Sequence, residues 1–194
     1  MDLNFTDDQQ ALRDSFAGLF ADVAGVDVVR AAEPLGYDEK VWDQLIRTGA
    51  PTMAVPEDRG GGGAGSLEVV IVAQEFGRRL APAPLIESIV ACSLLARAGA
   101  PEPIMHGVVD GSILPTVALV PVHAGTARLV PGGAVADLVV ALDGDQLVVL
   151  RRRSGSRPHS PAPDNLGCSP IADWSLSDPS VDRLVLVDGV RAEA

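Results

Sequence analysis

The fold of the first half of this 194-residue chain is decided by residues 72–85, which read VAQEFGRRLAPAPL. The first part of this stretch continues a helix that we expect Ser66 to cap and that runs through Arg79. Two prolines then end that helix, because proline lacks an N–H and its ring clashes with the preceding turn. A second helix is expected over residues 85–97, closed by Gly99. Both helices are largely apolar, which is typical of the buried helices of a bundle.

Two further helices are expected before this stretch. Residues 6–9 read TDDQ, a capping box in which a threonine hydroxyl and a glutamine side chain satisfy each other's backbone N–H groups. The helix that starts there should end near residues 24–25. Asp38 is placed to cap the next helix, which should end at Gly49. The glycine run at residues 60–63 could cradle a phosphate, but no Lys-Ser or Lys-Thr pair follows it, so a surface loop is favoured.

The period of the hydrophobic pattern changes beyond Gly111. Runs rich in β-branched residues predict strands, and Asp143-Gly144 lies between two of them as a hairpin turn. The sequence therefore predicts an α+β fold, with an all-α helical domain over residues 1–111 and a small antiparallel domain, barrel-like or sandwich-like, over residues 112–194. The predicted strands lie within residues 113–120, 135–142, 146–150 and 183–187.

Composition excludes several kinds of partner. The formal net charge is −11 and the pI is about 4.5, whereas surfaces that bind nucleic acids or anionic membranes need clustered Lys and Arg. No window reaches the roughly 18 apolar residues of a membrane helix, and the acidic start lacks a signal-peptide basic region, so we expect a cytoplasmic protein. Cys92, Cys168 and three histidines do not stand at the spacings of a metal site or a disulfide scaffold.

Three segments carry a family resemblance. They read WDQL at residues 42–45, VPED at 55–58 before the glycine run, and VAQEFGRRLAPAPL at 72–85. In this order they resemble the N-terminal domain of acyl-CoA dehydrogenases, whose members place a VPEEYGG-type loop between helices and follow it with EELGR and, in bacteria, LAPxPL. Residues 130–137, VPGGAVAD, are more loosely similar to the middle β-domain of that family. The resemblance covers nearly the whole chain.

The resemblance implies a FAD-dependent enzyme that introduces an α,β double bond into an acyl-CoA thioester. The family's first flavin segment, TEPxxGSD, corresponds to residues 119–123, where one proline is retained. Its second, WIT or WIS, corresponds to residues 129–131, where neither the aromatic ring nor the hydroxyl is present. Flavin contacts are therefore expected from backbone groups only, at Leu119, Val120, Val130 and Pro131.

The resemblance also suggests where the acyl group lies. Leu85, Ser88 and Cys92 share one helix face, and the corresponding family helix closes the far end of the acyl pocket. Small side chains at positions 88 and 92 would leave room for a bulky acyl group, although plain core packing is the simpler interpretation. Arg151-Arg152-Arg153 with Arg157 could pair with the phosphates of CoA, and a solvated loop is the alternative.

No catalytic residue is assigned in this chain, because the family's carboxylate base belongs to a third domain. We therefore expect a truncated acyl-CoA dehydrogenase that is inactive alone and binds FAD only in the intact protein or complex. The alternatives are a non-catalytic partner subunit of a heteromeric dehydrogenase, or an acyl-CoA-binding scaffold module. The expected partners are acyl-CoA and either further copies of the chain or a complete dehydrogenase subunit, without a metal, nucleic acid or membrane insertion.

Overall fold

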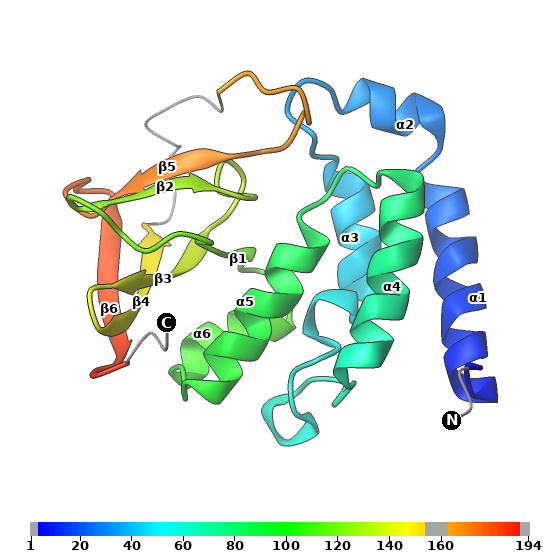
Figure 1. Ribbon diagram of the computed structural model, residues 1–194, viewed down its shortest axis with the longest axis horizontal. Coiled ribbons are helices and arrows are strands. Elements are labelled where there is room, and N and C mark those ends of the chain that lie inside the picture. Colours follow the sequence, from blue (N-terminus) through cyan, green and yellow to red (C-terminus); the bar gives the residue numbers. More distant parts are fainter. Residues whose placement is uncertain (1–3, 154–162, 191–194) are drawn as a thin grey trace.

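The computed structural model describes residues 4–153 and 163–190, and in these ranges the helices come first and the strands second (Figure 1). This order confirms the predicted α+β class. The α-helices are α1 Asp7–Val23, α2 Val26–Ala31, α3 Glu39–Arg47, α4 Ser66–Arg79, α5 Leu85–Arg97 and α6 Glu102–Val109, with short 3₁₀ turns at Ala50–Thr52 and Glu57–Arg59. The strands are β1 Pro115–Val117, β2 Thr126–Val130, β3 Leu138–Asp143, β4 Gln146–Arg152, β5 Ala172–Ser175 and β6 Val181–Val187.

Most of the predicted helix ends are confirmed by their hydrogen bonds. The Gln9 N–H donates to Thr6 Oγ1 at 3.2 Å and the Thr6 N–H donates to Gln9 Oε1 at 3.1 Å, which is the reciprocal pair of a capping box. At the start of α3, Asp38 Oδ1 accepts from the Val41 N–H at 3.0 Å. The expected cap at Ser66 is wrong by one position, since Gly65 is the N-cap and Ser66 is the first helical residue.

The strands form two sheets. One has four strands in the order β1-β3-β4-β6, and the other pairs β2 with β5. The expected antiparallel pairing holds for β3 with β4, β4 with β6, and β2 with β5, but β1 lies parallel to β3. The chain leaves β1, passes through β2 and returns before entering β3, and such a crossover gives two neighbours the same direction. The larger sheet is therefore mixed, and the described strands do not close into a barrel.

Strand β3 contributes to the hydrophobic core on both of its faces. Val139 and Ala141 pack in one buried cluster with Trp174 of the smaller sheet, whereas Leu138 and Val140 pack in a second cluster with residues of α5 and α6. Successive side chains of a strand point to opposite faces, so alternate residues reach different neighbours. The first cluster also contains buried residues of α1, α3 and α5. The helical and strand regions thus share their core.

The glycine run is a packed loop whose backbone groups are used within the fold. The N–H groups of Gly61, Gly62 and Gly63 donate to the carbonyl oxygens of Pro56, Thr52 and Val55 at 3.1, 3.3 and 2.9 Å. These amides are turned inward, which leaves them unable to cradle a phosphate and confirms the loop interpretation. A Cβ on Gly61 would lie 2.3 Å from both the Cβ and the carbonyl oxygen of Val55.

Candidate functional site

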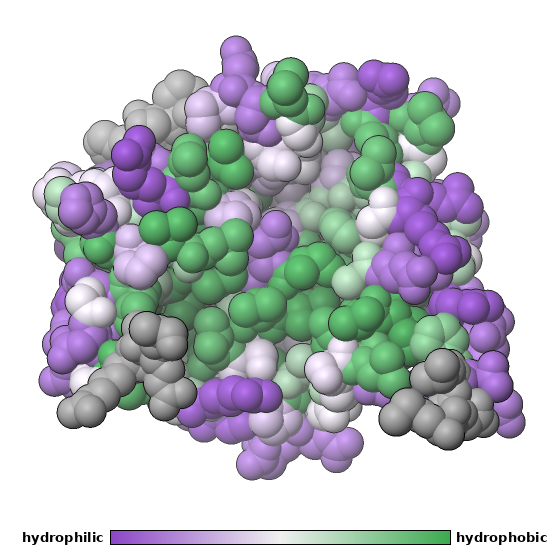
Figure 2. Space-filling model, viewed as in Figure 1, coloured by the Kyte–Doolittle hydropathy of each residue, from purple (hydrophilic) through white to green (hydrophobic). Residues whose placement is uncertain are grey.

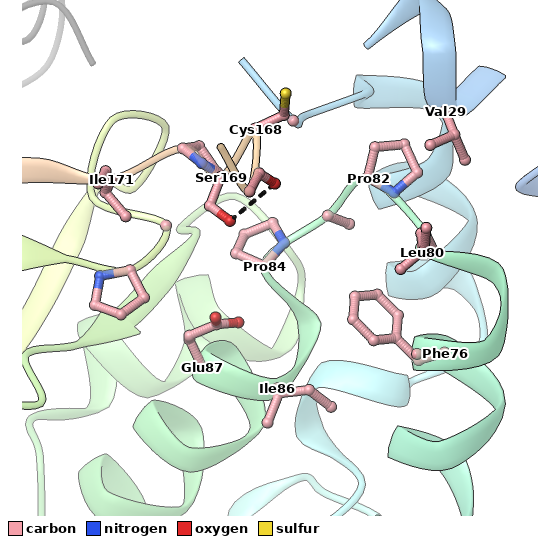
Figure 3. A pocket seen from close by; sticks show the side chains of 18 of the residues that line it. Val29, Phe76, Leu80, Pro82, Pro84, Ile86, Glu87, Cys168, Ser169 and Ile171 are labelled. Carbon is pink, nitrogen blue, oxygen red and sulfur yellow. Dashed lines mark hydrogen bonds between the residues drawn. The ribbon is translucent and has the colours of Figure 1, made fainter. Parts of the chain in front are cut away.

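A cleft of about 580 Å³ opens where the helices meet the strands. Its walls come from the end of α4, the turn at residues 80–84, the start of α5, residues 131–132 after β2, and residues 166–171 before β5, with a rim from α2 and Gly36 (Figure 3). Hydrophobic residues also gather across the middle of this face of the molecule, between the strands on the left and the helices on the right (Figure 2). A concave site of this size lies in the range of ligand pockets.

Backbone geometry around residues 80–84 shapes one wall of the cleft. Leu80 ends α4 with a left-handed φ of 51°, and the prolines at 82 and 84 prevent the helix from continuing. The N–H of Asp38 donates to the Pro82 carbonyl oxygen at 2.9 Å, which ties this turn to the start of α3. The LAPAP sequence therefore directs the chain from α4 into α5 and leaves an apolar edge on the cleft.

The upper wall of the cleft comes from a segment distant in sequence. Residues 166–171 reach over from β5 toward the connection between α2 and α3, where they run beside the blue part of the chain (Figure 1). A Cβ on Gly36, whose φ is 73°, would lie 1.6 Å from the Cys168 carbonyl oxygen. Such an approach of two backbones is possible only with glycine at position 36.

The lining of the cleft is mainly apolar, with Phe76, Leu80, Ile86, Pro131 and Ile171 among its residues. Its polar side chains include Glu33, Ser169 and Glu87. Burial raises the pKa of Glu87, and its own backbone N–H offsets part of that rise. Figure 3 shows the Glu87 carboxylate turned toward Pro84 and the segment that carries Ser169. Sequence reasoning missed Glu87, and the one available signal was an acidic residue in the first turn of an otherwise apolar helix.

The four predicted flavin-contact residues are not in equivalent positions. Leu119 and Val120 follow β1 and are 73% and 59% exposed, whereas Val130 is fully buried in the first core cluster. Pro131 lines the cleft. The structure therefore brings Pro131 to the candidate site and places Val130 behind it, and the contact of all four with a flavin stays a prediction.

The chemistry of residues 129–131 does not fit the isoalloxazine ring of FAD. Pro131 has no N–H, and its carbonyl accepts a hydrogen bond from Thr116 Oγ1. The Val130 carbonyl accepts from the Gly133 N–H at 3.0 Å, and the Leu129 N–H donates to Asp173 Oδ1 at 2.7 Å. Residues 129–131 thus offer no side-chain donor, and their backbone groups are engaged inside the fold.

The predicted acyl-pocket residues share a face of α5, but that face packs inward. Leu85, Ser88 and Cys92 are all fully buried, and Ser88 Oγ donates to the Pro115 carbonyl oxygen at 2.7 Å. Burial raises the pKa of the Cys92 thiol to about 12, as expected of a small apolar core residue. Their neighbours Ile86 and Glu87 line the cleft instead. A role of the three residues in acyl binding remains a prediction.

The arginine cluster lies at the end of β4, and two of its members are held by the protein itself. The Arg152 guanidinium lies 4.2 Å from the centroid of the Trp174 ring and donates to the carbonyl oxygens of Ala136 and Gly133, both at 3.1 Å. Arg153 forms an ion pair with Asp182 at 2.7 Å. Arg157 belongs to a loop predicted between residues 154 and 163. Of this loop, the structure describes Pro163.

The described residues contain neither a group of metal-binding side chains nor a helix that could span a membrane. No group of three or more His, Cys, Asp or Glu side chains in residues 4–153 and 163–190 could hold a metal ion. No helix in the same ranges is both long enough and apolar enough to cross a membrane.

Comparison with known proteins finds a family model and curated relatives that match this sequence. Residues 6–103 match the family model "Acyl-CoA dehydrogenase, N-terminal domain". The curated protein "Acyl-CoA dehydrogenase IpdE2" of Mycobacterium tuberculosis is 37% identical over 145 residues, which are 73% of this chain and 44% of that protein. The protein of the same name from Mycolicibacterium smegmatis is 32% identical over a stretch of the same length. The chain thus spans less than half the length of these relatives.

Solved structures show the same fold. A variant of the "Tcur3481-Tcur3483 steroid ACAD" superimposes with a TM-score of 0.69 at 26% identity, covering 92% of this chain and 56% of that one. The "ChsE4-ChsE5 complex from Mycobacterium tuberculosis" gives a TM-score of 0.64 at 23% identity, covering 98% and 56%. Butyryl-CoA dehydrogenase from Megasphaera elsdenii gives 0.69 at 16% identity, covering 97% and 61%.

Proposed function

The chain belongs to the acyl-CoA dehydrogenase family, and we propose that it supplies the wall that holds the acyl group in an assembly that dehydrogenates acyl-CoA thioesters at the α,β position. Residues 1–111 would act as the N-terminal helical domain and residues 112–194 as the middle β-domain. The assembly would work in the cytoplasm with FAD as its electron acceptor, and it would contain further copies of this chain or a complete dehydrogenase subunit.

The observation that carries this proposal is the apolar cleft between the 80–87 segment and residues 131–132. An acyl chain is recognised mainly by removing its surface from water, which is favourable in proportion to the apolar area buried. The structurally similar Tcur3481-Tcur3483 protein is a steroid ACAD, which supports a bulky acyl group as the occupant. Phe76, Leu80 and Ile86 would contact that group directly.

We predict that replacing Leu80 with arginine weakens the binding of decanoyl-CoA to the purified chain about tenfold, measured by isothermal titration calorimetry. Leu80 is 72% exposed at the cleft, so the change should leave the core intact while placing a charge where the acyl chain would lie. Val90→Arg is the matched control, because Val90 is 43% exposed on α5 and does not line the cleft. Equal affinities for both variants would contradict the proposed site.

A second candidate function is a non-catalytic partner subunit, which would shape the acyl site while another chain holds the flavin. It is favoured by the chemistry of residues 129–131, where Pro131 has no N–H and the neighbouring backbone groups are engaged. The apolar side chains of Leu119, Val120 and Leu129 are exposed, and such side chains are the kind of surface that a partner covers. When bound in the assembly, FAD would accept the hydride.

The two candidates differ in where the flavin is bound. If the chain is a non-catalytic partner, the purified chain should show no flavin absorbance after incubation with FAD and removal of the free cofactor by gel filtration. Adding the chain should also raise the dye-linked activity of the companion dehydrogenase that co-purifies with it. A yellow chain that desaturates acyl-CoA alone would contradict the partner role. A companion with the same activity in its presence and absence would contradict it too.

A further inference from the structure

Glu87 is an acidic side chain on the wall of an apolar cleft, and the described part of the chain gives its carboxylate no partner side chain. Among the described residues, none donates a side-chain hydrogen bond to Glu87 or forms an ion pair with it, and the interaction that lowers its pKa comes from its own backbone N–H. Glu87 is partly buried at the wall of the cleft, so its carboxylate oxygens keep lone pairs that a ligand in the cleft could use.

The other polar side chains of the cleft are already engaged. Glu33 accepts from Arg30 Nη1 at 3.3 Å, in an ion pair between two exposed side chains. The N–H of Ser169 donates to Asn165 Oδ1 at 3.0 Å, and Ser169 Oγ has a weaker contact with the Gly167 carbonyl oxygen at 3.4 Å. Glu87 is therefore the cleft carboxylate to which the described residues give neither a side-chain hydrogen bond nor an ion pair.

The presence of an acidic residue at position 87 has a local explanation. Glu87 lies in the first turn of α5, where Pro84 provides no side-chain cap, and a carboxylate at a helix N-terminus is stabilised by the free N–H groups there. That interaction favours an acidic residue at this position, but it does not require the carboxylate to face the cleft. Figure 3 shows that it does so, beside Pro84 and above Ile86.

We propose that Glu87 is a specificity-determining residue that hydrogen-bonds a hydroxyl group on the acyl part of an acyl-CoA thioester. The inference rests on the proposed function, because it assigns the cleft to the acyl group. A carboxyl group accepts from a hydroxyl when it is ionised and can also donate to it when it is protonated, so an alcohol suits both states. The substrate class is therefore hydroxylated acyl thioesters.

The test compares matched ligands on the full chain by isothermal titration calorimetry. Octanoyl-, decanoyl- and dodecanoyl-CoA are each measured against their ω-hydroxy counterparts, so that flexible chains of several lengths can bring a hydroxyl to Glu87. For at least one length, the hydroxylated ligand should bind about tenfold more tightly than its parent, as expected for a hydrogen bond to a charged group. Equal affinities at every length would overturn the proposal while leaving the acyl site standing.

Variants then assign the preference to Glu87. Glu87→Leu should abolish it while keeping the affinity for the parent thioester, and Glu87→Gln should retain part of it because an amide oxygen still accepts from a hydroxyl. Glu39→Gln is the control and should keep the full preference, because Glu39 is exposed at the start of α3 and does not line the cleft. A preference that survives in Glu87→Leu would overturn the proposal. If none of the thioesters binds the wild-type chain, the proposed function fails and the role of Glu87 fails with it.

Discussion

Replacing Trp174 with alanine is expected to lower the free energy of unfolding by about 3–5 kcal/mol, the range for removing a large aromatic side chain from a core. Trp174 is 2% exposed and packs with the side chains of β3 that face the smaller sheet. Its Nε1–H donates to the Gly133 carbonyl oxygen at 2.9 Å, and the Arg152 guanidinium lies over its ring. The substitution would leave a cavity, remove one of the two side-chain hydrogen bonds that the Gly133 carbonyl accepts, and uncover the Arg152 guanidinium.

Urea unfolding followed by far-ultraviolet circular dichroism measures this loss. Leu166→Ala is a suitable control, because Leu166 is fully exposed and its truncation should change the unfolding free energy by less than about 0.5 kcal/mol. Trp174→Phe should fall between the two, since it keeps much of the apolar volume and loses the hydrogen bond. A Trp174→Ala protein as stable as the control would show that the β2-β5 pair adds little to the core.

The second large effect is expected at Gly61, where alanine should destabilise the chain by about 1–3 kcal/mol or more through overpacking. The added Cβ would lie 2.3 Å from the backbone oxygen of Val55 and 2.7 Å from that of Thr52, so backbone rather than a flexible side chain would have to move. Val55 is fully buried, which prevents an easy shift. The midpoint of thermal unfolding should fall accordingly.

Gly18→Ala provides the contrast within the same chain. Gly18 lies on the exposed side of α1 with no atom within 4 Å of an added Cβ, so alanine there should stabilise the protein by up to about 1 kcal/mol through its higher helix propensity. If both alanine variants melted at the same temperature, the close packing of the glycine loop would be contradicted. A lower melting temperature for Gly61→Ala and a higher one for Gly18→Ala would confirm that close packing requires glycine at position 61 but not at position 18.

Local sequence signals predicted the helices that have strong end signals. The bounds of α5 agree with the prediction because prolines precede the helix and glycine follows it, and α1 begins at its capping box. Helices α2 and α6 and strands β2 and β5 were not predicted as separate elements. Helix α2 has six residues with three valines, a composition that suggests a strand, and β5 is a four-residue ADWS segment with no apolar run. Elements this short are determined by their tertiary neighbours.

The candidate site could be predicted only in part, for a related reason. Helical periodicity correctly put Leu85, Ser88 and Cys92 on one face, but it does not state whether that face meets the core or a cleft. In the structure that face is buried in the core, and Glu87 lines the cleft instead. The upper wall also depends on residues 166–171 reaching the Gly36 region, a long-range contact that has no signal in a single sequence.

The double-faced packing of β3 limits how this protein could exchange parts with its relatives. Recombination between residues 111 and 112 would look harmless in the linear sequence, because the crossover falls between helices and strands. Leu138 and Val140, however, are fitted to the particular α5 and α6 that precede them. A chimera with foreign helices would therefore need compensating changes at these two strand positions before its halves could pack as well as the parental ones.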